Sequence, residues 1–169
     1  GRLPSDDDHI NETNIRPIWK DEALYTVKKT IEISSKDTDD TAADKAITAI
    51  IKARKDYKGS GNPTFYTTED CVTNCLLMKD GIGHRLYKTV DELATALRVS
   101  EIVTVPVMEN TTRTDSGKTY TLMGIMVNLA DYNVGADKGG AINMFDDFDI
   151  DYNQQKYLIE TRCSGALIK

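Results

Sequence analysis

The sequence predicts an α+β protein, and three observations lead to this prediction. Runs of β-branched and aromatic residues, typical of strands, occur among segments whose apolar residues recur at helical spacing. The two kinds of segment do not follow the regular strand–helix–strand order of a doubly wound sheet. The chain has 169 residues, of which 40% are hydrophobic, so it can bury one substantial core. An α+β fold is therefore favoured over a doubly wound sheet.

The first elements are expected within residues 1–63. Residues 1–22 are polar and acidic and indicate an extended arm, whereas residues 24–33 are rich in β-branched side chains and predict a strand. A helix is expected from Asp40 or Thr41, because Thr41 and Asp44 have the spacing of a capping box. Residues 59–63 (GSGNP) end it, because glycine permits left-handed backbone and proline cannot continue a helix. Its inward residues are predicted to be Ala43, Ala46, Ile47, Ile50, Ala53 and Tyr57.

The middle of the chain predicts a short strand and two further helices. The strand covers residues 64–67, and Thr67 or Thr68 caps the helix that follows. Val72, Cys75, Leu76 and Lys79 are expected along one side of that helix. The third helix opens at Thr89, where Glu92 completes a capping box, and its inward residues are Leu93, Ala96 and Leu97.

The second half of the chain is expected to be mostly strands. Residues 102–107 predict a strand at a sheet edge or with a bulge, because Pro106 cannot donate to a central ladder. Residues 109–118 predict a polar loop, and residues 120–129 a strand in which Gly124 marks the close approach of a neighbour. From residue 147 aspartates alternate with apolar residues, which predicts a half-buried strand, and residues 157–168 predict another.

Composition argues against several functions. The formal net charge of −6 argues against a general nucleic-acid binder, which needs a basic face. No apolar run approaches the roughly 18 residues that indicate a membrane span. The three cysteines include no CxxC pair and are interpreted as reduced packing residues.

Candidate catalytic and metal-binding residues are few. Asp147 would begin an EF-hand loop, but Tyr152 and Leu158 stand where that loop needs glycine and glutamate. No glycine cluster has the spacing of a phosphate-binding loop, and no cofactor is predicted. His84, working with Asp80 or Glu69, defines the one enzyme hypothesis, a small cytosolic hydrolase.

Two charged clusters are the candidate interface residues. Four cations lie near the end of the first predicted helix, and three acids alternate along the strand near residue 150. If several copies assemble, these clusters are expected to face each other between neighbours. The candidate residues are Lys52, Arg54, Lys55, Lys58, Asp147, Asp149 and Asp151.

An ordered set of strings along the chain resembles the major capsid protein of tailed bacteriophages, whose fold is shared with encapsulin compartments and the herpesvirus capsid floor. No single string is diagnostic, but their order spans nearly the whole chain. The strings are residues 15–18 and 24–26, 53–64 (ARKDYKGSGNPT), 66–70, 93–99, 105–109, 145–153 (FDDFDIDYN) and 156–167 (KYLIETRCSGAL).

The resemblance implies a structural protein, not an enzyme. Residues 36–130 would form the axial domain, a mixed sheet with about three helices. Residues 1–35 and 131–169 would contribute an arm and long flanking strands of the peripheral domain. The N-terminal arm, extended loop and spine helix of the family are absent, so we expect a C-terminal portion of a capsid subunit.

The resemblance also implies partners and a location. Copies of the chain would form pentamers and hexamers of an icosahedral shell enclosing DNA, with scaffolding and portal proteins as partners. The shell would assemble in the bacterial cytoplasm and become the virion capsid, with no membrane and no specific nucleic-acid binding. Alternatives are an encapsulin-like shell, the hydrolase, and a monomeric module that binds a peptide at a strand edge.

Overall fold

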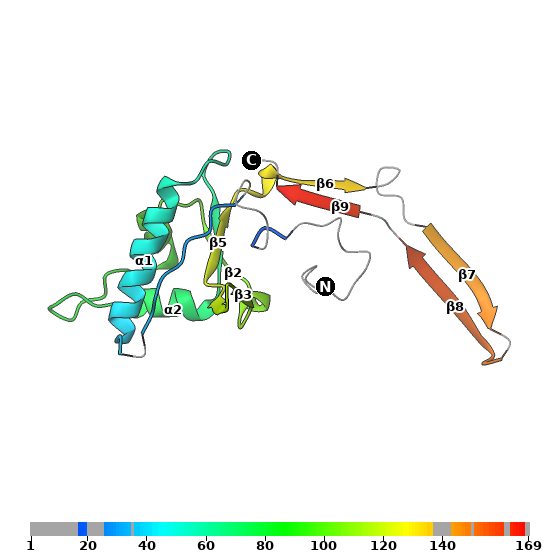
Figure 1. The fold of residues 1–169 in the computed structure, drawn as a ribbon, viewed down its shortest axis with the longest axis horizontal. Helices are drawn as coiled ribbons and strands as arrows, with labels where there is room; N and C mark the ends of the chain where they lie inside the picture. The colour runs from blue at the N-terminus through cyan, green and yellow to red at the C-terminus, as the bar shows by residue number, and fades with distance from the viewer. Residues whose placement is uncertain are drawn as a thin grey trace. The chain divides into compact units, whose positions relative to one another are not determined.

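The computed structural model describes residues 17–19, 26–34, 36–136, 143–149, 151–160 and 163–167 (Figure 1). Within these residues the protein is α+β, as predicted, with three α-helices and a mixture of parallel and antiparallel strand pairs. The chain divides into two compact units. One covers residues 27–131, and the other contains the four strands that begin at Tyr132. The assignment of axial and peripheral domains stays a prediction.

The three helices begin at threonine caps. They are α1 (Asp39–Lys55), α2 (Glu69–Leu77) and α3 (Val90–Leu97), capped by Thr38, Thr68 and Thr89. Each threonine hydroxyl accepts a hydrogen bond from the amide three residues later, which satisfies a donor that the helix leaves unpaired. The caps of α2 and α3 confirm the predictions.

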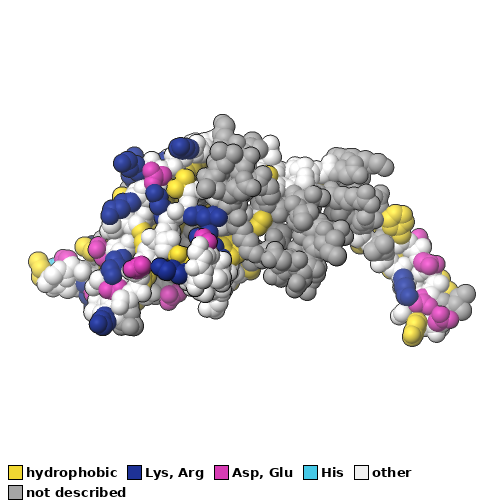
Figure 2. Space-filling model, in the orientation of Figure 1, with side chains coloured by type: hydrophobic (Ala, Val, Ile, Leu, Met, Phe, Trp, Pro, Cys, Tyr) yellow, Lys and Arg dark blue, Asp and Glu magenta, His cyan; other side chains and the backbone are white. Residues whose placement is uncertain are grey.

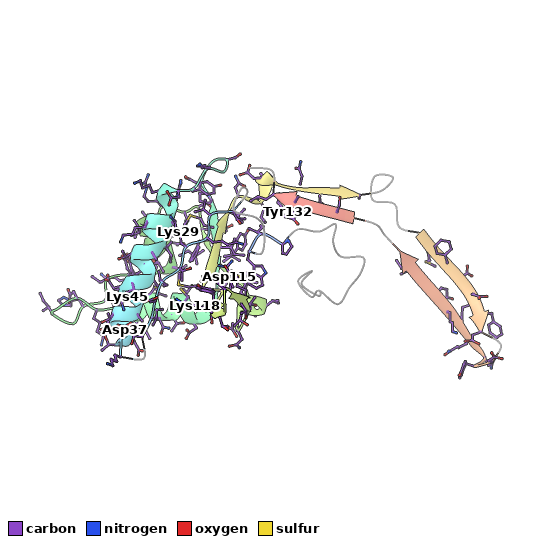
Figure 3. All side chains as sticks on the ribbon, viewed as in Figure 1. Lys29, Asp37, Lys45, Asp115, Lys118 and Tyr132 are labelled. Carbon is purple, nitrogen blue, oxygen red and sulfur yellow. The ribbon has the colours of Figure 1, made fainter. Side chains whose placement is uncertain are left out.

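The predicted cap of α1 at Thr41 was wrong. Thr38 has extended backbone and caps the helix, so Asp39 and Asp40 fall in the first turn, where the helix dipole favours acids. Asp37 lies just before the cap and accepts a hydrogen bond of 2.6 Å from the Lys45 ammonium group (Figure 3). The helix also ends earlier than residue 59, since Asp56 follows its last residue as the C-cap.

A three-stranded sheet joins these helices in the unit of residues 27–131. The central strand β1 (Thr64–Thr67) pairs in parallel with β2 (Ile102–Thr104) and antiparallel with β5 (Gly124–Val127). Strand β2 lies at an edge of the sheet and ends at Thr104. The predicted strand at 102–107 was therefore too long, because Pro106 starts a 3-10 turn at Pro106–Met108. A Cβ atom on Gly124 would lie 2.6 Å from the Phe65 ring, which confirms the predicted close approach.

The core of this unit lies between the helices and the sheet. Its buried residues include the predicted positions Ala43, Ile47, Ile50, Cys75, Leu93 and Leu97. Ala94, which was not predicted, is also buried, whereas Ala53, Tyr57 and Ala96 are only half-buried. At the centre Thr67 is fully buried, and its hydroxyl donates to the Met123 carbonyl at 2.7 Å.

Three predicted elements of this unit need correction. The described part of the predicted strand at 24–33, residues 26–33, belongs to no strand. The predicted loop at 109–118 contains a hairpin of β3 (Thr112–Asp115) and β4 (Lys118–Thr121), which turns at Ser116 and Gly117 with positive φ. The predicted strand at 120–129 is split between β4 and β5, and a 3-10 turn, Leu129–Asp131, follows.

The remaining strands form two antiparallel pairs. Strand β6 (Tyr132–Ala136) pairs with β9 (Cys163–Leu167), and β7 (Asn143–Asp149) pairs with β8 (Gln154–Glu160). The single strand predicted at 157–168 is therefore two strands with different partners. Strand β7 ends at Asp149, and Asp151 and Tyr152 lie in the turn, where Asn153 has positive φ.

Candidate subunit interface

The cationic cluster near the end of α1 presents three exposed lysines. Lys52 and Lys55 lie in the last turns of the helix, and Lys58 follows its C-cap. Figure 2 shows lysine and arginine side chains (dark blue) spread over the part of the molecule that contains α1, with acidic side chains (magenta) among them. Within the described residues none of the three lysines forms an ion pair, so their charges remain available to a partner.

Arg54, the fourth predicted cation, is used inside its own unit. Its Nε donates to the Arg98 carbonyl at 3.1 Å, and its guanidinium group lies 5.0 Å from the centre of the Tyr57 ring. Arg98 is the C-cap of α3 and has left-handed backbone, so Arg54 ties the end of α1 to the end of α3. Arg54 therefore stabilises its own unit. The helical spacing of the four cations could not predict this, because Arg98 lies outside the helix.

The three predicted acids lie close together at the turn end of the β7–β8 hairpin, but they differ in role. Asp149 forms a salt bridge with Lys156 and accepts a hydrogen bond from the Asp151 amide, and its side chain is only 12% exposed. It therefore stabilises the turn. Asp147 and Asp151 are exposed and form no ion pair with the described residues, so they are the acids that can meet an external cation.

The main feature missed by sequence reasoning is an exposed apolar face on this hairpin. The cross-strand pairs Met144–Ile159, Asp146–Tyr157 and Phe148–Gln155 place their side chains on one face. Met144, Phe148, Tyr157 and Ile159 are 64%, 51%, 63% and 67% exposed. We call these four residues the apolar face of the ribbon. The prediction of a half-buried strand was therefore wrong for the described chain.

The size of this apolar face can be estimated. Large side chains bury roughly 150–250 Å² when covered, so four that are more than half exposed offer about 400 Å². This area is comparable to that of the largest exposed apolar patch on a typical monomer, and such a patch often marks an interaction site. A sequence signal existed, because Met144 and Phe148 in β7 and Tyr157 and Ile159 in β8 fall on one face at strand spacing, with Asp146 and Gln155 among them.

The hydrolase hypothesis depends on His84, which lies in the loop after α2. Its Nδ1 is 3.5 Å from an oxygen of Asp80, and its side chain is 79% exposed. The other Asp80 oxygen accepts hydrogen bonds from the amides of Ile82 and His84, at 2.9 and 2.8 Å. These backbone hydrogen bonds lower the pKa of Asp80. These contacts assign Asp80 and His84 a structural role in the loop that follows α2.

No group of three or more histidines, cysteines or acids in the described part of the chain could hold a metal ion. A hollow lies against the β7–β8 hairpin, lined by seven residues of the two strands: Phe145, Asp146, Asp147, Gln154, Gln155, Lys156 and Tyr157. It is a surface depression on the ribbon and contains neither His84 nor Asp80.

Comparisons with known protein families, curated proteins and solved structures find no match to this chain. The longest helix of the described residues is α1, with 17 residues, and none of the described helices combines the length and apolar character needed to cross a membrane.

Proposed function

We propose that this chain is a structural subunit that associates with its own copies, as the resemblance to the major capsid protein of tailed bacteriophages implies. In this proposal it contributes the C-terminal part of a capsid fold, forms pentamers and hexamers, and encloses DNA in a virion shell. Scaffolding and portal proteins are its proposed partners. The proposal assigns it no catalytic role.

The observation that carries the proposal is the exposed apolar face of the β7–β8 ribbon. A two-stranded ribbon is marginally stable by itself, and it gains stability when a partner covers an apolar side. This face offers about half of the roughly 800 Å² that each partner contributes to a standard interface. A contact of this size is weak singly, but many equivalent contacts in a closed ring act together.

Charge distribution supports association between copies. The ribbon carries four aspartates, at 146, 147, 149 and 151, against the single lysine Lys156. The exposed lysines 52, 55 and 58 belong to the other unit of the chain. A surface of each sign on one chain permits a heterologous contact, in which one surface of a copy meets a different surface of the next and rings can close. Such pairing raises association rates and sets the register.

Electron microscopy of the complete gene product, expressed in bacteria, tests the proposed function directly. We expect closed shells or rings of five or six subunits, and sedimentation velocity should show the matching large species. A monomer that persists at tens of micromolar would contradict the proposal. An encapsulin-like shell, the alternative with the same contacts, would differ by enclosing protein cargo in place of DNA.

Charge reversal tests the proposed pairing within the assembly. Lys52→Glu with Lys55→Glu should weaken association at least tenfold, because like charges would then oppose each other. The matched control is Lys28→Glu with Lys36→Glu, which makes the same charge change at exposed lysines outside the cluster. Adding Asp147→Lys and Asp151→Lys to the first pair should restore assembly. Equal assembly of all these variants would refute the pairing.

A second set of variants tests the apolar face itself. Met144→Thr with Ile159→Thr removes apolar surface but keeps residues that favour strands. Gln154→Thr is the control, because Gln154 is paired with Asp149 on the opposite face. We expect the first pair to dissociate the assembly and the control to leave it intact. If both behave alike, the apolar face does not form the contact.

A further inference from the structure

Two cysteines lie one turn apart on α2. Cys71 is in the first turn and Cys75 in the second, and residues four apart on a helix are neighbours on one face. Cys75 is 2% exposed and belongs to the core, whereas Cys71 is half-buried and packs against the edge of that core. Cys71 is therefore the more accessible of the two cysteines.

The two thiols affect each other's acidity. Interaction with the Cys75 thiol lowers the pKa of Cys71 to about 7. The same interaction, together with burial, raises the pKa of Cys75. The amide of Cys71 also donates to the Thr68 hydroxyl at 3.3 Å, which fixes the first turn on which Cys71 lies. Near neutral pH Cys71 is thus partly ionised, whereas Cys75 stays a thiol.

The helix prevents the usual product of two adjacent thiols. A disulfide needs a particular approach of the two Cβ atoms, and side chains four apart on a regular helix diverge too far for it without backbone movement. An atom that bonds to both sulfurs does not have this restriction, because the sulfurs need not reach bonding distance of each other and side chains four apart on a helix lie on one face. The geometry thus favours a bridging ligand over oxidation.

We propose that Cys71 and Cys75 form a two-thiol site for a thiophilic ligand of the trivalent arsenical class. In the reaction an organoarsenic oxide, R–As=O, loses its oxygen and forms two As–S bonds. Both thiol protons leave on that oxygen as one water molecule, and arsenic and sulfur keep their oxidation states. Cys71, the more accessible and more acidic thiol, forms the first bond, and Cys75 closes the ring. This site is independent of the proposed assembly.

The experiment uses phenylarsine oxide and the full chain in a Cys163→Ser background, so that the pair supplies the only thiols. Intact mass spectrometry should show one reagent per chain with loss of one water. Because the second bond forms within the molecule, removal by the monothiol 2-mercaptoethanol should need at least about 100-fold more competitor than in Cys71→Ser or Cys75→Ala. Dithiothreitol, a dithiol, should remove the reagent readily.

Folding is checked on the same samples. Far-UV circular dichroism of the adduct should keep the helical signal, and both single-cysteine variants should melt cooperatively. Cys71→Ser is the decisive variant, since its side chain is outside the fully buried core. The proposal is overturned if the folded parent forms no adduct, if Cys71→Ser retains the reagent as firmly as the parent, or if the adduct forms only with loss of the helical signal.

Discussion

Gly124 provides a sharp test of the packing in the three-stranded sheet. A Cβ atom there would lie 2.6 Å from two carbons of the Phe65 ring and 3.0 Å from the Tyr66 carbonyl oxygen. Phe65 is 4% exposed, so its ring cannot swing into solvent. Overpacking of this kind costs about 1–3 kcal/mol, whereas replacing a strand glycine recovers about 0.5–1 kcal/mol. Gly124→Ala should thus lower the free energy of unfolding by about 1–2 kcal/mol.

Urea denaturation followed by circular dichroism measures this loss. With a slope of about 2 kcal/mol/M, the midpoint should fall by about 0.5–1 M. Gly81→Ala is the matched control, because no atom lies within 4 Å of its added Cβ and its φ is not positive, and its midpoint should stay unchanged or rise slightly. Phe65→Leu should relieve part of the clash in the double variant. If Gly124→Ala is as stable as Gly81→Ala, the packing argument is refuted.

Three further predictions concern polar contacts in the same unit. Asp131→Asn should lower the free energy of unfolding by about 1–2 kcal/mol in urea titrations, because the buried carboxylate accepts from the Ser60 amide and hydroxyl at 2.6 and 2.5 Å. Thr68→Ala should cost about 1 kcal/mol by the same assay, since the cap of α2 is lost. The Lys45 ammonium group lowers the pKa of Asp37, so the stability from this pair is present above the carboxyl's ordinary pKa and is lost as pH falls through the lowered value. Asp37→Asn should therefore reduce the loss of thermal stability as pH falls below the ordinary carboxyl pKa. A pH dependence of the melting temperature equal to that of the parent would contradict this.

The helices were predictable because their determinants are local. Thr68 and Thr89 cap the helices that follow them, and the buried residues of α1 and α3 recur at the spacing visible in the sequence. The error at α1 was also local: Thr38 and Thr41 are both plausible caps, and Thr38 prevails because it leaves two aspartates in the first turn.

The strands were less predictable because each needs a partner from elsewhere in the chain. Residues 26–33 have strand-like side chains but pair with no described strand. Residues 112–115 are polar and were interpreted as a loop, yet they pair with β4 across the turn at Ser116 and Gly117. The interpretation of residues 157–168 as one strand failed for the same reason, since β8 and β9 have different partners.

The candidate interface was likewise predictable in its local features and unpredictable in its remote contacts. The sequence alone identified the two clusters of opposite charge, because residue type and spacing are sufficient for that. Only the tertiary structure showed that Arg54 binds the carbonyl of Arg98, 44 residues away, that Lys156 neutralises Asp149, and that the apolar face of the ribbon is exposed. A helix completes its hydrogen bonds within four residues, so its position is encoded locally. Strand pairing, ion pairing and burial depend on remote segments and are decided by the folded chain.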